Sequence, residues 1–207
     1  MPKARAQDPK PKGSAGDVTR GRLLAAAGSL VAERGWGSVT TRAVAERAGV
    51  NQALVHYHFG TMENLLREAV MARLQPEVQA LVDELLDERP IPEGIRRVMG
   101  LLDRFDLNTE VGVLMAEALL QATRDERISL AMGEVVGSFS TMLEPRLVLA
   151  QERGVIRDDV DPASLGLVLA AMLDGFLIQR MADPDADPEK AADTLIQLLK
   201  PIQEDPR

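Results

Sequence analysis

The sequence contains no cysteine, and that absence removes several kinds of chemistry at once. The chain can form no disulfide, no thiolate metal site and no cysteine nucleophile. It also has no stretch of about 18 unbroken apolar residues that could span a membrane. The longest candidate, residues 165–178, is interrupted by Gly166, Asp174 and Gly175. No apolar run follows the basic first residues, so we expect no secretion signal and a cytoplasmic protein.

Runs of alternating β-branched residues, which would form a sheet, are missing as well. Apolar residues instead recur at three- and four-residue spacing, with short breaks at Gly, Pro, Asn or Asp. This pattern predicts an all-α chain of about nine helices. We expect a three-helix head over 17–60, continued by a helix at 61–75, and a larger helical body over 61–207. Residues 1–16 are polar and are predicted to form a disordered basic arm.

Capping residues predict where the helices begin and end. In the head, a helix is expected from Asp17 to Arg34, the next is capped by Thr40 or Thr41, and the third starts at Asn51. Helix 4 is capped by Thr61 and leads toward Pro76. In the body, Pro145 is expected to kink or end a helix because proline removes a backbone donor. The predicted caps of the body are Asn108, Asp161 and Asp187, and another helix is expected to begin near Asp125.

The charge distribution favours nucleic acid as the partner of the head. The whole chain carries a net charge of -8, but residues 1–60 hold nine Lys or Arg against four Asp or Glu. A basic head on an acidic body suits one surface for phosphates and a body that stays away from DNA. A chance fluctuation together with a basic tail is the alternative reading of the charge alone.

Residues 41–59 carry the spacing of a helix-turn-helix. Two short helices that cross steeply need a small residue at their contact, which Ala45 supplies, and a residue tolerant of left-handed geometry at the turn, which Gly49 supplies. The second helix of such a motif enters the major groove. The apolar residues expected to form its small core are Val44, Ala48, Val50, Val55 and Phe59.

Residues 17–75 resemble the DNA-binding region of the TetR family of repressors. The matching segments are Leu23-Leu24-Ala25-Ala26-Ala27, Glu33-Arg34-Gly35-Trp36, Val39-Thr40-Thr41, Val44-Ala45-x-x-Ala48-Gly49-Val50 and Tyr57-His58-Phe59, followed by Glu63-Asn64-Leu65-Leu66. The resemblance implies a homodimer that binds a near-palindromic operator on double-stranded DNA and represses transcription until a small-molecule effector binds the body.

The resemblance also implies which residues contact DNA. The family's base-reading positions correspond to Arg42, Asn51, Gln52, Ala53 and Leu54, and its phosphate contacts correspond to Tyr57, His58 and Thr61. We add Thr41 and His56, which stand beside these positions, to the predicted DNA contacts. Two residues depart from the pattern, because His56 replaces the usual Tyr and Met62 replaces a common Lys. The second departure removes a phosphate contact.

Side-chain chemistry supports base reading by two of these residues. Arg42 can donate two hydrogen bonds to guanine O6 and N7, and Gln52 can pair with adenine N6 and N7. Outside this motif, a lone Arg or Gln on a helix is usually solvated surface. The only two histidines, His56 and His58, are two residues apart on a helix, so their side chains diverge and do not suit a metal site. No cofactor is predicted.

Methionine and phenylalanine side chains of the body could line an effector pocket, although methionines at helical spacing usually form core. With few aromatic and few basic residues in the body, we expect a largely apolar, uncharged effector. The candidate pocket residues are Met99, Leu102, Phe105, Met115, Leu119, Phe139, Met142, Met172 and Phe176.

The helices at 165–180 and 190–202 have apolar residues on more than one face, which predicts a dimer interface between two copies of both helices. Its candidate residues are Gly166, Ala170, Leu173, Leu177, Leu195, Leu198, Leu199 and Ile202. Asp174 is unusual in this apolar setting. It could pair with an Arg, line a polar cavity or face water at the interface edge.

Three other functions compete with a ligand-released repressor. An enzyme finds no support, since the sequence has no Ser/His/Asp order, metal-ligand spacing or phosphate-binding glycine loop. A DNA-binding regulator that responds to no ligand and an activator both stay open.

Overall fold

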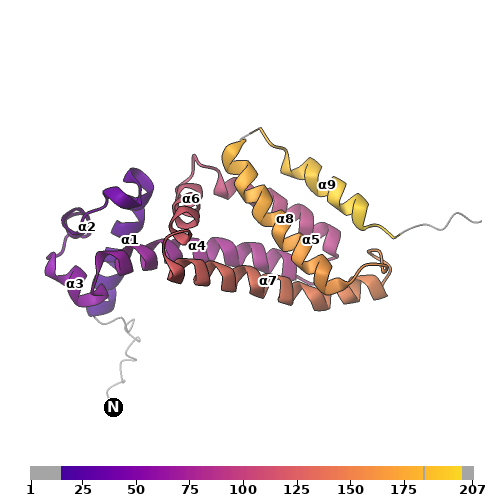
Figure 1. Cartoon of the computed structure of the whole chain (residues 1–207), viewed down its shortest axis with the longest axis horizontal. Helices are drawn as coiled ribbons and strands as arrows, with labels where there is room; N and C mark the ends of the chain where they lie inside the picture. Colours follow the sequence, from indigo (N-terminus) through magenta and orange to yellow (C-terminus); the bar gives the residue numbers. More distant parts are fainter. Residues whose placement is uncertain (1–14, 184, 202–207) are drawn as a thin grey trace, which may run out of the picture.

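The computed structural model describes residues 15–183 and 185–201, except for the side chains of 15, 134–140, 180 and 181. Figure 1 shows a small helical head joined to a longer helical body, with no strand in the described part of the chain. This confirms the all-α prediction. The elements are α1 (Ala15–Arg34), η1 (Trp36–Ser38), α2 (Thr41–Ala48), α3 (Ala53–Phe59), α4 (Met62–Leu86), α5 (Ile91–Leu101), η2 (Leu102–Phe105), α6 (Glu110–Ala122), α7 (Glu126–Glu152), α8 (Pro162–Ala182) and α9 (Pro188–Leu199).

Short polar side chains cap most of these helices where the sequence predicted. Thr40 Oγ1 accepts a hydrogen bond from Ala43 N at 3.2 Å, and Thr61 Oγ1 accepts one from Asn64 N at 3.1 Å. Each such cap typically stabilises a helix by about 1 kcal/mol. Three aspartates, Asp125, Asp161 and Asp187, cap α7, α8 and α9 in the same way. The cap of α6 is one residue later than predicted, since Thr109 rather than Asn108 accepts the bond from Gly112 N.

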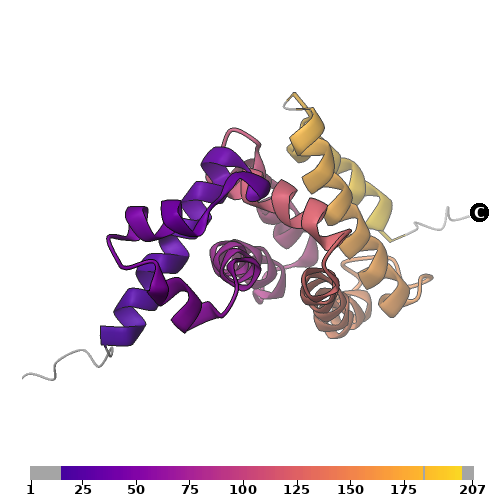
Figure 2. The ribbon, with the colours of Figure 1, turned by 60° about the vertical axis from the view of Figure 1, so that its left-hand side comes forward.

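Helix α4 is longer than predicted and connects the two parts of the molecule. It runs through Pro76 to Leu86 instead of stopping at 75. Proline in a helix interior removes one hydrogen bond, and Pro76 is exposed, so water can satisfy the freed carbonyl. The first half of α4 buries Leu66 and Val70 in the head, and the second half buries Leu81 and Leu85 in the body. In Figure 2, α4 is seen nearly end-on between them.

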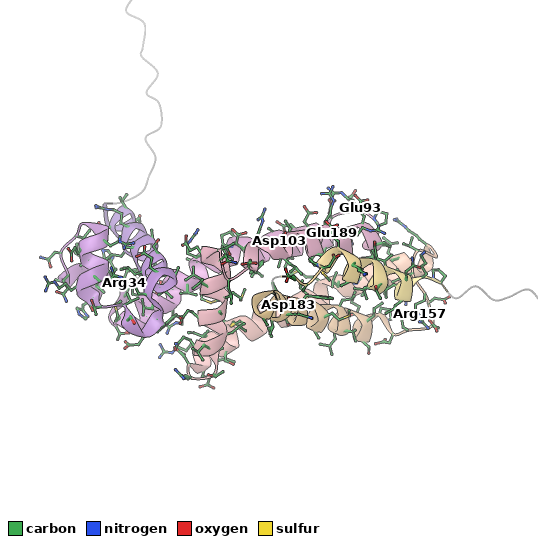
Figure 3. The ribbon with its side chains drawn as sticks, turned by 90° about the horizontal axis from the view of Figure 1, so that it is seen from above. Arg34, Glu93, Asp103, Arg157, Asp183 and Glu189 are labelled. Atoms are coloured by element: carbon green, nitrogen blue, oxygen red, sulfur yellow. The ribbon has the colours of Figure 1, made fainter. Side chains whose placement is uncertain are left out.

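In the body, α7 and α8 pack side by side, whereas α9 packs on α5. Helix α7 also continues through its proline, Pro145, which is exposed. The backbone N of Arg157 in the α7–α8 connection donates to the carbonyl of Leu199 at 2.8 Å, and Arg96 on α5 pairs with Asp193 on α9 at 3.0 Å. Figure 3 shows Arg157 at the end of the body farthest from the labelled Arg34 of the head. These contacts fasten α9 to its own protomer.

This packing corrects most of the predicted dimer interface. Six of its residues are buried inside the protomer and therefore cannot contact a partner without opening the core: Gly166, Ala170, Leu173, Leu177, Leu195 and Leu199. Leu198 is 64% exposed, and Ile202 lies outside the described residues. Helix α8 does carry apolar residues on two sides, one buried in the protomer and one exposed. For α9, however, the buried side faces α5 and not a second copy.

The opposite side of α8 is apolar and uncovered. Leu167, Val168 and Ile178 are 60%, 51% and 55% exposed. By length and composition residues 162–179 of α8 could cross a membrane, with a mean hydropathy of 1.5, yet only 22% of this segment is buried. A partly buried core helix of a protein outside membranes meets the same criterion. We call the face formed by Leu167, Val168, Ala171, Gly175 and Ile178 the outer face of α8.

Candidate nucleic-acid interface and effector site

The turn between α2 and α3 has the geometry that the sequence predicted. Gly49 ends α2 with φ 63° and ψ 42°, a left-handed conformation that glycine adopts without strain. A side chain there would also collide with Arg22 of α1, whose Nη2 would lie 2.8 Å from the added Cβ. Val44, Ala45, Ala48, Val55 and Phe59 are all buried, so the turn is fixed by the core beneath it.

Four of the predicted DNA contacts present free side chains at this turn. Arg42, Gln52, Ala53 and Tyr57 are all exposed, and Tyr57 is 80% exposed. Among the described residues, the side chains of Arg42 and Gln52 form no hydrogen bond with any protein group, so both keep their hydrogen-bonding capacity for another molecule. Tyr57 packs edge-on against His58, with ring centroids 5.0 Å apart, while most of its surface faces solvent.

The other predicted contacts take part in local structure. Helix α3 begins at Ala53, two residues after the predicted start, because Asn51 Oδ1 accepts a hydrogen bond from Ala53 N at 2.8 Å and so precedes the helix. Leu54 is partly buried against the head core. Thr41 Oγ1 lies 3.7 Å from Met62 Sδ, and His56 Nδ1 lies 3.1 Å from the carbonyl oxygen of Gly60. Thr61 caps α4, as described above.

Two arginines of the head are engaged by acidic partners. Arg47 on α2 forms two hydrogen bonds with the Glu33 carboxylate on α1, at 2.7 and 2.8 Å, which hold the pKa of Glu33 below its ordinary value. Arg20 pairs with Glu68 and lies 5.2 Å from the ring centre of Phe59. Their charge is therefore partly neutralised. Arg42 and Arg22 are exposed arginines next to the turn, and Arg22, unlike Arg42, was not predicted as a functional residue.

Residues 23–69, which contain this turn and the helices around it, match the family model for bacterial regulatory proteins of the tetR family. Residues 23–69 are therefore a DNA-binding domain of the tetR family type. The chain is similar to the HTH-type transcriptional regulator BetI of Rhizobium meliloti, with 26% identity over 173 residues that cover 82% of this chain and 81% of BetI. It is also similar to the HTH-type transcriptional repressor NicS of Pseudomonas putida, with 25% identity over 82% of this chain and 85% of NicS.

The fold of the whole chain, beyond its head, has counterparts among solved structures. A transcriptional regulator from Saccharomonospora viridis, solved in complex with choline, superposes with a TM-score of 0.68. The match has 23% sequence identity and covers 86% of this chain and 93% of that one. The body is therefore the helical domain of the same fold. The matched domain and the relatives BetI and NicS all belong to transcriptional regulators and not to enzymes.

Most of the predicted effector residues lie in the interior of the body. Met99, Leu102, Phe105 and Met115 are buried in the core. Three others, Leu119, Met172 and Phe176, are partly buried against it. Met142 is a correction, because its side chain is 46% exposed on the surface of α7. The side chain of Phe139 lies outside the described residues.

A groove of about 300 Å³ lies at the junction of head and body. Residues of α1 form one wall, and the first turn of α6 and the residues before it form the other: Ser29, Ala32, Glu33, Asn108, Thr109, Glu110 and Val113. None of the predicted effector residues lines it. The groove was not predicted, because it depends on how α6 meets α1, which periodicity within each helix does not specify.

Asp174 is half-buried on α8, and it does not form the predicted pair with an arginine in the described part of the chain. No arginine or hydrogen-bond donor pairs with it there, and burial raises the pKa of its carboxyl above the ordinary value. On a helical wheel Asp174 stands between the buried stripe of α8 and the outer face, next to Leu167 and Ile178. It therefore lies at the edge of that face.

Proposed function

We propose that this regulator is a repressor that binds a near-palindromic operator as a homodimer and is released by a small-molecule effector. The observation that carries the DNA-binding part is the pair Arg42 and Gln52. Both are exposed beside a turn fixed by Gly49, and both keep their donors free. Two such heads, about 34–36 Å apart, would read successive major grooves of one face of DNA. The protein would act in the cytoplasm, where this DNA is located.

The outer face of α8 supports the homodimer. Several exposed apolar residues on one helix face are typical of an interface that removes them from water. The same face of a second copy, related by a two-fold axis, would bury them. Ala171 and Gly175 leave room for the two helices to approach closely. Val148 and Leu149 of the adjacent α7 are 38% and 42% exposed and would extend the contact.

The methionine-rich interior supports an effector site in the body. Met99, Met115 and Met172 have flexible, polarisable side chains that can repack around a bound molecule. We expect a largely apolar effector, and the choline complex of a protein with this fold is a precedent for a small organic molecule in such a body. Effector binding that favours a different head orientation would weaken operator binding, and DNA would weaken effector binding equally.

Selection of bound sequences from random DNA tests operator recognition. Arg42→Ala and Gln52→Ala should each lower affinity by about 1–3 kcal/mol and relax the preference at one position per half-site. Tyr57→Phe, which removes a hydroxyl expected to contact phosphate, should instead weaken all sequences alike. A uniform loss of affinity in all three variants would show that Arg42 and Gln52 do not read bases.

The dimer is tested by the charge pair Leu167→Asp and Ile178→Asp, which should produce monomers in light scattering and abolish operator binding. The matched control is Leu198→Asp on α9, which introduces the same charge at a 64% exposed leucine outside the outer face. The control should stay dimeric. A dimeric Leu167→Asp/Ile178→Asp protein would place the interface elsewhere.

A further inference from the structure

The carboxyl end of α3 is held by a side chain from α4. Asn64 Nδ2 donates a hydrogen bond at 3.0 Å to the carbonyl oxygen of Phe59, the last residue of α3. A helix leaves its final carbonyls without partners inside the helix, so this bond fixes a group that would otherwise depend on water. Asn64 is partly buried, and its own backbone N is held by Thr61. The amide is therefore rigid on both sides.

The oxygen of the same amide faces the start of α7. It accepts a hydrogen bond from Arg67 Nη2 at 2.8 Å and lies 3.4 Å from Arg127 Nη1. Arg67 Nη1 lies 3.7 Å from Asp125 Oδ2, while the other carboxylate oxygen of Asp125 caps α7 through Arg127 N at 2.9 Å. We call the connection from Phe59 through Asn64 and Arg67 to Asp125 the Asn64 relay.

The relay joins the DNA-reading head to the body by a route separate from the backbone of α4. Its charged members are largely shielded, since the side chains of Arg67 and Asp125 are only 18% and 31% exposed. The Arg67–Asn64 hydrogen bond is charge-assisted and therefore stronger and more directional than a surface ion pair, whereas Arg67 and Asp125 form an ion pair at 3.7 Å. A small displacement of the start of α7 would therefore shift the Arg67 side chain, then the Asn64 amide, and then the carboxyl end of α3.

We propose that Asn64 and Arg67 are positioning residues for DNA recognition, which hold α3 at the orientation set by the N-terminus of α7. The inference rests on the proposed function of α3 as the DNA-reading helix. Movement of α7 away from Arg67 frees the carboxyl end of α3 and lowers operator affinity, even when α4 itself does not bend.

Three substitutions separate the relay from the capping of α7. Asn64→Ala removes the amide altogether. Asp125→Asn keeps the cap, since asparagine caps helices as well as aspartate does, but removes the charge that faces Arg67. The matched control is Asp193→Asn, the same substitution in the exposed Arg96–Asp193 pair of the body, which is remote from the relay.

The primary measurement is the distance between head and body within one protomer. The chain has no cysteine, so Glu46→Cys on α2 and Gln197→Cys on α9 introduce two spin labels at exposed sites. Dilution with unlabelled protein confines the dipolar signal to one protomer, whether or not the chain dimerises. Asn64→Ala and Asp125→Asn should broaden the distance distribution, and Asp193→Asn should leave it unchanged.

Operator affinity is the second readout, measured on DNA selected by the wild-type protein. Loss of the Asn64–Phe59 hydrogen bond in Asn64→Ala corresponds to at most about a tenfold weaker affinity. Asp125→Asn, which removes the charge of the Arg67–Asp125 ion pair, should weaken affinity in the same direction by no more than this. Unchanged distances in the relay variants would overturn the inference, even if their stability fell. If the wild-type protein selected no DNA, the proposed function would fail, while the distances would still decide whether the relay orients the head.

Discussion

Gly112, in the first turn of α6, makes the clearest test of how closely α6 packs against the segment that precedes it. The residue is buried, and a methyl group on it would overlap the carbonyl group of Asp106 and lie 2.5 Å from the carbonyl oxygen of Phe105. Backbone atoms cannot swing aside, so Gly112→Ala must push α6 away from the segment before it. The shift would break the cap at Thr109, worth about 1 kcal/mol, and strain the packing by about 1–3 kcal/mol.

Alanine in place of glycine returns about 1 kcal/mol of helix propensity, so we expect a net loss of about 1–3 kcal/mol in the free energy of unfolding. For a chain of this size each kcal/mol corresponds to a fall of about 2–4 °C in Tm. Urea denaturation measures the loss directly. The control is Gly100→Ala on α5, where an added Cβ meets nothing within 4 Å and a small gain is expected. Equal stability of wild type and Gly112→Ala would refute the close approach of α6 to Asp106.

Two further predictions follow from charge. Burial raises the pKa of the Asp174 carboxyl in the folded state, so the ionised carboxylate destabilises the folded protein. Asp174→Asn should therefore raise the free energy of unfolding at pH 7. Urea titrations should show this gain vanishing as pH falls toward about 4, where the carboxyl is protonated in both states. A gain that does not change with pH would assign the effect to packing. Deletion of residues 1–14, which include Lys3, Arg5, Lys10 and Lys12, should make DNA binding less dependent on salt. The slope should fall by about 0.9 log units for each phosphate that the arm neutralises, and an unchanged slope would show that the arm neutralises none.

Local signals in the sequence were sufficient to predict the positions of most helix starts. Thr61, Asp161 and Asp187 were predicted as caps, as was Thr40 or Thr41, and a helix start was predicted near Asp125. Thr40, Thr61, Asp125, Asp161 and Asp187 each accept a backbone hydrogen bond in the structure. A cap involves residues only two or three positions apart, so its geometry is encoded within one turn. The turn at Gly49 was predictable for the same reason.

Features that depend on a neighbouring element were not predictable in this way. Pro76 looked like a helix end, but α4 packs along its whole length on α1, α5, α6 and α7, and that packing outweighs the one hydrogen bond that proline removes. The sequence predicted that one side of α9 is apolar, but it could not show whether that side packs on α5 of the same protomer or on a second copy of the chain. The relay through Asn64 joins residues 59 and 125, a separation that no periodicity connects.

The apolar core is one continuous cluster that extends from Leu23 in α1 to Leu199 in α9. Leu65, Leu66, Ala69 and Val70 of α4 complete the core of the head, so a fragment ending at Phe59 would leave it open. Head and body are then expected to unfold in a single cooperative transition. A premature stop codon that removes these α4 residues would consequently leave no folded head able to occupy the operator permanently. For a ligand-released repressor, such mutations would cause loss of repression and not its permanent retention.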